Sequence, residues 1–167
     1  MSEFFKRQKT WISSAHQGFV REGMHSNTLP AYALAAEKGA DMIETDARMT
    51  RDGVLIVHHD PDVKGFDAAD NPVTCLIREA DFADLEKIRL IRGNSGEGAR
   101  IPTLEETLRL AYFAGMCVNI DLKEGLAHAE EIARLAVSSG MRGRTVYATN
   151  GAGAEAILRI LKIDPQA

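Results

Sequence analysis

Apolar and polar residues alternate along this chain with two different periods that follow one another. Short apolar runs predict β-strands over 11–16, 42–49, 54–57, 117–123 and 145–148. Apolar residues three to four positions apart predict helices over 28–39, 103–111, 132–140 and 154–162. Strands that alternate with helices are typical of a parallel sheet covered by helices. We therefore predict a single α/β domain over residues 1–167.

Residues at two predicted helix starts have the chemistry of caps. Asn27 and Thr28 precede the first helix, whose first turn tolerates Pro30. Thr103 and Glu106 have the spacing of a capping box. Both starts therefore agree with the predicted boundaries.

The segment after the third predicted strand differs in composition from the rest. A tight turn is predicted at Asp52-Gly53, just before that strand. Residues 61–100 are rich in Gly, Asp and Asn, which are typical of loops, and one short helical piece is predicted over 81–88. We expect this segment to be an insertion between elements of the main sheet.

Composition and charge exclude several classes of protein. The net charge of −4 offers no basic patch, so no nucleic acid is expected as a partner. The sequence has no apolar run of membrane-spanning length and no signal-peptide core, so stable membrane insertion is not expected. Cys75 and Cys117 have no partner at metal-ligand spacing, which favours reduced thiols in a cytoplasmic protein.

Two acidic residues in the second predicted strand are the first candidates for chemistry. Alternate side chains of a strand share a face, so Glu44 and Asp46 point the same way, opposite Ile43 and Ala47. Two carboxylates aimed at one point repel unless a cation lies between them, and oxygen ligands suit Mg²⁺ or Ca²⁺. Such a pair also occurs on the solvated face of antiparallel sheets, so it is not decisive alone.

Further polar residues lie late in the neighbouring strands. Asp121 and Lys123 share one face of the fourth predicted strand, and His16 and His59 follow the first and third. Parallel α/β sheets and barrels bind ligands at the carboxyl ends of their strands. We therefore predict that these residues form one site, while His58, of opposite parity to His59, is structural.

Short motifs along the chain occur in the order found in a known family. They are Ala15-His16-Gln17-Gly18, Asn27-Thr28, residues 39–46, residues 50–54, His59-Asp60, Ile101–Glu106 and Asn119–Lys123. From Ala15 onward, nearly the whole chain resembles the glycerophosphodiester phosphodiesterases, including an insertion after the third strand.

This resemblance implies a (β/α)8 TIM barrel that hydrolyses glycerophosphodiesters to sn-glycerol 3-phosphate and an alcohol, with a divalent cation. It implies that Glu44, Asp46 and Asp121 bind the metal, that His16 and His59 are the general acid and base, and that Lys123 binds phosphate. The family usually has glutamate where Asp121 stands. The set suits the reaction, because a cation and a lysine neutralise charge that builds up on phosphate while imidazoles move protons.

Two positions depart from the family motifs. Gln17 stands where an arginine is expected, and Ser26 stands where a glutamate is expected. We hypothesise that Arg48, which shares its parity with Glu44 and Asp46, supplies the missing positive charge to the substrate phosphate. A surface arginine at the end of a strand is the alternative.

Chain length limits how much of a barrel can form. A complete (β/α)8 barrel typically needs about 250 residues, and these 167 accommodate about five strand–helix units. We expect either a piece of a longer gene product or a homo-oligomer whose second copy completes the barrel.

Other functions remain open at this stage. The lost arginine and glutamate and the missing strands fit a non-catalytic binding or regulatory barrel, or an inactive fragment of an enzyme. A related phospholipase C- or D-type phosphodiesterase would need a membrane-facing loop, which the short polar insertion does not offer. Both enzyme hypotheses predict a small-molecule phosphodiester as substrate.

Overall fold

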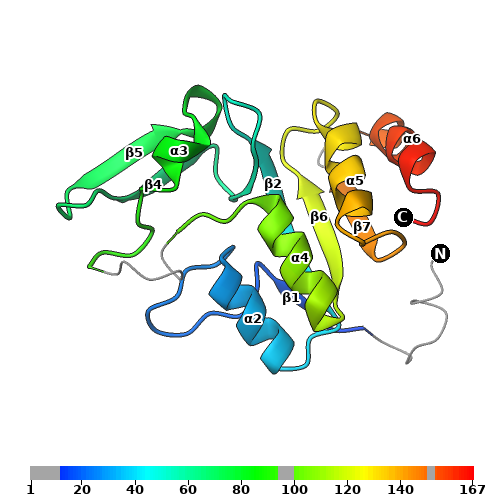
Figure 1. Cartoon of the computed structure of the whole chain (residues 1–167), viewed down its shortest axis with the longest axis horizontal. Coiled ribbons are helices and arrows are strands. Elements are labelled where there is room, and N and C mark those ends of the chain that lie inside the picture. Colours follow the sequence, from blue (N-terminus) through cyan, green and yellow to red (C-terminus); the bar gives the residue numbers. More distant parts are fainter. Residues whose placement is uncertain (1–11, 94–99, 150–152) are drawn as a thin grey trace.

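A parallel sheet forms the centre of the molecule. The computed structural model describes residues 12–93, 100–149 and 153–167, and Figure 1 shows their arrangement. The strands β1 (Ser14–His16), β2 (Met42–Met49), β6 (Cys117–Leu122) and β7 (Thr145–Thr149) lie side by side in that order and run parallel. Within the described residues, β1 and β7 are the edges of this order. The predicted parallel α/β fold is confirmed.

Helices pack on the side of the sheet that faces away from the acidic residues. They are α2 (Leu29–Glu37), α4 (Leu104–Ala114), α5 (Ala129–Ser138) and α6 (Gly153–Ile163), seen beside the strands in Figure 1. Ile43 and Ala47 of β2 and Ile120 of β6 are buried in the same core as Leu108 of α4 and Ile132 of α5. The predicted alternation of faces along β2 is therefore correct.

The predicted capping residues are found at the starts of two helices. The Thr103 side chain accepts a hydrogen bond from the Glu106 backbone N–H (3.1 Å), and the Glu106 carboxylate accepts one from the Thr103 N–H (2.9 Å). This confirms the capping box of α4. Thr28 is the N-cap residue of α2, but its hydroxyl donates to the His25 carbonyl (2.6 Å) and caps no helix N–H.

The third strand differs from its prediction in direction. The short β3 (Leu55–Val57) pairs antiparallel with β2, with Ala47 opposite Val57. Too few residues separate the two strands for a parallel crossover, which needs about a dozen residues or more. The count of five strand–helix units is therefore wrong, because β3 belongs to a hairpin and four strands run parallel within the described residues.

The insertion is more regular than predicted. Residues 61–100 contain a second sheet of β4 (Asp62–Phe66) and β5 (Pro72–Leu76), followed by the 3-10 turn η1 (Ile77–Glu79) and α3 (Phe82–Leu85). The short helix near 81–88 is confirmed, but the prediction of an otherwise irregular loop is wrong for residues 61–93, and residues 94–99 lie outside the described residues. A second small core contains Val63, Ile77 and Leu85 of the insertion together with Ile56 of β3. The insertion extends beyond the main sheet in Figure 1.

The start of the first strand, the two cysteines and the lengths of the helices were also predicted from the sequence. The predicted first strand began at residue 11, which lies outside the described residues, and β1 begins at Ser14. Both cysteines are free: Cys75 is half-buried and Cys117 is buried. In the described part of the chain, no helix has the length and apolar character needed to cross a membrane.

Candidate active site

Three carboxylates lie together on the inner face of the sheet. Strand register places Asp46 of β2 directly beside Asp121 of β6, with Glu44 two residues earlier on the same face. One oxygen of each carboxylate lies within 4.8 Å of the others, and all three residues are buried. The structure thus brings the predicted metal ligands together, and their binding of a metal stays a prediction.

The cluster carries more negative than positive charge. Lys123 places its Nζ 2.9 Å from Asp46 Oδ1 and 2.7 Å from Asp121 Oδ2. Burial alone would lower the pKa of Lys123, but the hydrogen bonds and charges of these two carboxylates outweigh it and raise this pKa. Burial and the nearby charge of Asp46 raise the pKa of Glu44. One ammonium faces three carboxylates, so a divalent cation fits the charge and the donor atoms of this space.

Two amide side chains hold the far oxygen of Asp46. Gln17 Nε2 donates to Asp46 Oδ2 at 2.9 Å, and Asn27 Nδ2 donates to the same oxygen at 2.7 Å. The Gln17 backbone N–H also donates to Glu44 Oε2 (3.1 Å). Both amide residues have left-handed backbone angles, with φ of 55° at Gln17 and 56° at Asn27. Neither side chain was predicted from the sequence to belong to the site.

Gly18 allows the loop that carries Gln17 to lie against α2. Its φ is +83°, and a Cβ at this position would be 2.8 Å from the backbone of Ala31. A residue with a side chain would meet both a disfavoured backbone angle and a backbone clash. Glycine therefore fixes the path of the chain directly after His16.

The two candidate catalytic histidines lie at the exposed rim of the cluster. His16 ends β1, opposite Glu44 in register, and its Nε2 lies 3.8 Å from Glu44 Oε2. His59 Nδ1 is 2.8 Å from Asp60 Oδ1, and because a carboxylate only accepts, Nδ1 carries the hydrogen. This bond lowers the pKa of Asp60 and directs the other ring nitrogen of His59 away from Asp60.

The antiparallel direction of β3 explains how His59 reaches the site. After β3 the chain returns along β2, and the His58 backbone N–H donates to the Asp46 carbonyl (3.0 Å). The His58 Nε2–H donates to the Asp62 carbonyl (3.2 Å), and burial lowers the pKa of this imidazole. A neutral His58 thus connects the insertion to the end of β3.

Arg48 contacts the backbone of the same loop. Its Nε and Nη2 donate to the His59 carbonyl at 3.1 and 2.7 Å, and its Nη1 lies 3.7 Å from Glu124 Oε1. The guanidinium therefore holds the backbone of His59 in place. Its predicted contact with a substrate phosphate stays a prediction.

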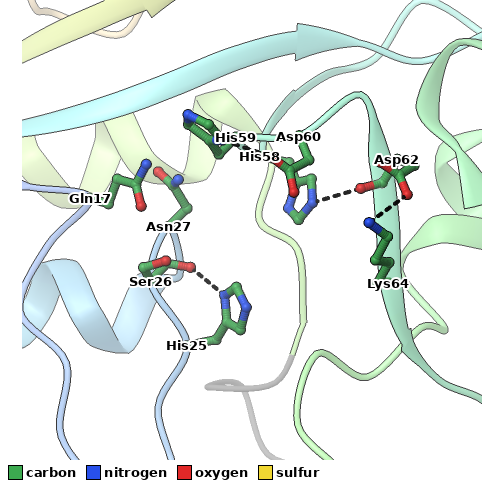
Figure 2. A pocket seen from close by; sticks show the side chains of 9 residues that line it. All are labelled: Gln17, His25, Ser26, Asn27, His58, His59, Asp60, Asp62 and Lys64. Atoms are coloured by element: carbon green, nitrogen blue, oxygen red, sulfur yellow. Dashed lines mark hydrogen bonds and ion pairs between the residues drawn. The ribbon is translucent and has the colours of Figure 1, made fainter. Parts of the chain in front are cut away.

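A polar cavity of about 340 Å³ opens beside these residues (Figure 2). Its lining comes from three segments, the loops before α2 and after β3 and the strand β4, and consists of Gln17, His25, Ser26, Asn27, His58, His59, Asp60, Asp62 and Lys64. None of these lining residues is an aliphatic residue, a phenylalanine, a tyrosine or a tryptophan. His25 and Lys64 were not predicted to line this site, because two segments far apart in the sequence, the loop before α2 and the strand β4, bring them to the cavity.

A match to a family model identifies the proteins to which this chain is related. The model of the glycerophosphoryl diester phosphodiesterase family matches residues 16–148, which include all the side chains of the cluster. The chain belongs to this family. The resemblance inferred from the sequence motifs is confirmed.

Individual relatives agree with the family model. This family member is 36% identical over 123 residues to "Probable glycerophosphodiester phosphodiesterase 2" of Mycobacterium tuberculosis, covering 74% of the chain and 42% of that protein. It is 32% identical over 114 residues to a glycerophosphodiester phosphodiesterase of Caldanaerobacter subterraneus, covering 67% of the chain and 45% of that protein. The chain thus spans less than half the length of these curated relatives.

Solved structures show the same fold. A glycerophosphodiester phosphodiesterase from Agrobacterium tumefaciens matches with a TM-score of 0.72 and 25% identity, over 93% of this chain and 64% of that one. An Oleispira antarctica phosphodiesterase in complex with the product sn-glycerol-3-phosphate matches with a TM-score of 0.71 and 21% identity, over 98% and 65% of the two chains. The TIM-barrel fold class predicted for this family member is confirmed, with part of the barrel present.

Proposed function

We propose that this chain carries the metal and acid–base residues of a glycerophosphodiester phosphodiesterase. One observation supports the proposal most strongly: three buried carboxylates share one space, and the two candidate histidines follow strands next to them. The family model spans these residues, and the similar relatives bear this enzyme's name. The products would be sn-glycerol 3-phosphate and an alcohol.

In the proposed mechanism, Glu44, Asp46 and Asp121 hold one divalent cation, Mg²⁺ or Ca²⁺. The bound cation would neutralise charge on the phosphate oxygens as the phosphorus–oxygen bond to the alcohol breaks. Lys123 lies at the edge of the same cluster, where its ammonium can turn from the carboxylates towards a non-bridging phosphate oxygen. Two positive charges would then lie close to the phosphate.

His16 and His59 would move the protons in this mechanism. One imidazole removes a proton from the attacking oxygen, and the other protonates the leaving alkoxide. The hydrogen bond from His59 Nδ1 to Asp60 orients its ring and leaves Nε2 for that transfer. Arg48 holds the His59 backbone from the other side, through the His59 carbonyl.

We propose that the alcohol portion of the substrate lies in the cavity of Figure 2. Its lining residues are polar, which suits a hydroxylated head group and offers no aromatic cage for a quaternary ammonium. The product sn-glycerol-3-phosphate bound to the Oleispira antarctica phosphodiesterase supports the assignment of the other portion.

The edges β1 and β7 leave room for further strands of a barrel. We propose that elements beyond the described residues pair with these edges, either from a longer polypeptide or from a second copy. The solved relatives support this, because they extend well beyond the matched part.

The two free cysteines support a cytoplasmic location.

A non-catalytic binding domain is the second candidate. The contact of Lys123 with both Asp46 and Asp121 favours it, because this ammonium already offsets part of the cluster charge without a metal. Gln17, in place of the expected arginine, also removes a positive charge that would face phosphate. Turnover of a phosphodiester separates the two candidates.

The test is release of sn-glycerol 3-phosphate from glycerophosphoglycerol, measured with Mg²⁺, Ca²⁺ or Mn²⁺ and with a chelator. The proposal predicts turnover that the chelator abolishes and that His16→Ala or His59→Ala reduces about 100- to 10,000-fold. His128→Ala is the matched control, because His128 pairs with Glu124 outside the carboxylate cluster. An absence of turnover with all three metals would support the binding domain.

A further inference from the structure

A fully buried phenol lies behind the carboxylate cluster. Tyr32 is on the core-facing side of α2 and is 0% exposed. Its hydroxyl oxygen is 2.7 Å from Asn27 Oδ1 and 2.8 Å from Thr45 Oγ1. An amide oxygen only accepts hydrogen bonds, so the single Tyr32 hydrogen goes to Asn27 and the Thr45 hydroxyl donates to Tyr32.

This direction of donation fixes the Asn27 amide. With Oδ1 accepting from Tyr32, the opposite end of the amide, Nδ2, faces Asp46 and donates to its Oδ2 at 2.7 Å. A flipped amide would aim its oxygen at the Asp46 carboxylate, where two acceptors repel each other. The carboxylate therefore selects the Nδ2 end of the amide, and the Tyr32 hydroxyl anchors the opposite end through Oδ1.

The fixed amide in turn determines how Asp46 presents its two oxygens. Oδ2 is held by Asn27 and by Gln17, whereas Oδ1 faces the cluster, where it contacts Lys123 Nζ at 2.9 Å. The carboxylate can therefore offer Oδ1 to a cation without rotating. Partners that orient a metal ligand in this way typically change metal affinity 10- to 100-fold when they are removed.

We propose that Tyr32 is a positioning residue for cation binding, which acts on Asp46 through Asn27. The chain of contacts runs from Thr45 on the helix-facing side of β2, through Tyr32 and Asn27, to Asp46 on the opposite side of the same strand. The inference rests on the cation site of the proposed function, but it does not require turnover.

A second phenol, which is partly buried, offers a control. Tyr147 of β7 also contacts a threonine hydroxyl, that of Thr145, at 3.2 Å, and it packs against the same core as Tyr32. Among the described residues, its hydroxyl bonds to Thr145 and to none of the cluster carboxylates. Tyr147→Phe therefore removes a comparable hydroxyl from the same layer and reports what a purely structural loss does.

The experiment is a Mn²⁺ titration followed by electron paramagnetic resonance, with thermal unfolding recorded for every variant. Tyr32→Phe is expected to raise the Mn²⁺ dissociation constant about tenfold, while Tyr147→Phe leaves it within about twofold. Asn27→Gly removes the amide and tolerates the left-handed backbone, so it tests the link if Tyr32→Phe folds poorly. Asn27→Gly is expected to raise the constant at least as much.

The double variant tests whether Tyr32 acts through Asn27. Once Asn27 is glycine, Tyr32→Phe is expected to add little, so the two effects are not additive. Additive effects, or equal constants for Tyr32→Phe and Tyr147→Phe, would overturn the inference while leaving the cation site intact. If the unaltered chain binds no Mn²⁺, both the cation site of the proposed function and the inference about Tyr32 fail.

Discussion

Substitution of Lys123 separates two proposed roles of its ammonium. The ammonium would compete with the cation for the carboxylates, which changes metal affinity, and it would bind the substrate phosphate, which changes the rate of hydrolysis. Its Nζ lies between Asp46 and Asp121, the carboxylates that would hold the cation, and its side chain is 13% exposed. Two unit charges 4 Å apart interact with about 4 kcal/mol at an effective dielectric constant of about 20. If a third of this energy, about 1.4 kcal/mol, opposes the incoming cation, removal of the ammonium lowers the dissociation constant of the cation tenfold.

Lys123→Met should therefore bind the cation about tenfold more tightly and hydrolyse phosphodiesters far more slowly. Isothermal titration calorimetry with Mg²⁺ and release of sn-glycerol 3-phosphate measure the two effects. Lys87→Met is the control, because Lys87 is largely exposed and pairs with Asp84 at 3.0 Å, outside the cluster and the cavity. An unchanged or weaker Mg²⁺ affinity in Lys123→Met would refute the idea that the ammonium and the cation compete.

Three further predictions concern the fold and the thiols. Glu106→Ala should lower the free energy of unfolding by about 1 kcal/mol at pH 7, because it removes the hydrogen bonds that the Glu106 carboxylate accepts from Thr103. Burial opposes it, but hydrogen bonds lower the pKa of Glu106, so its contribution exists above pH 4.5 and is lost as the pH falls through the lowered pKa, which urea unfolding at several pH values measures. Gly18→Ala should destabilise by more than about 1 kcal/mol in the same assay, because its Cβ would clash with Ala31. Burial raises the pKa of Cys117 to about 11, so a thiol reagent at pH 8 should label Cys75 and leave Cys117 unmodified in the folded protein.

The strand that carries the cluster could be predicted from local sequence. Alternation from Met42 to Met49 gave both its bounds and the shared face of Glu44 and Asp46, because one side of this strand must be buried. The convergence of Asp121 on the same space also followed, since parallel neighbours align their carboxyl ends.

The direction of β3 was missed although a signal was present. The tight turn at Asp52-Gly53 joins neighbouring strands that run antiparallel, and this turn was recognised without that consequence. The hairpin of β4 and β5 was missed for another reason. The strand β4 contains Gly65, and β5 begins with Pro72. Both residue types are typical of loops, so the strands cannot be recognised until their pairing is known.

The network behind Asp46 could not be predicted from periodicity. Tyr32 fits the apolar stripe of a helix, so its hydroxyl contacts with Asn27 and Thr45 depend on how α2 packs on the sheet. Gln17 was interpreted as the loss of a cation. In the structure its amide is a donor to Asp46, which only the left-handed turn after His16 makes possible.

The most direct test is a crystal structure with Mn²⁺, located by its anomalous scattering. One Mn²⁺ is expected with an oxygen from each of Glu44, Asp46 and Asp121 at about 2.0–2.6 Å, and with Lys123 displaced from between the carboxylates. A Mn²⁺ bound elsewhere, or a cluster that keeps Lys123 in place at saturating Mn²⁺, would contradict the shared cation site.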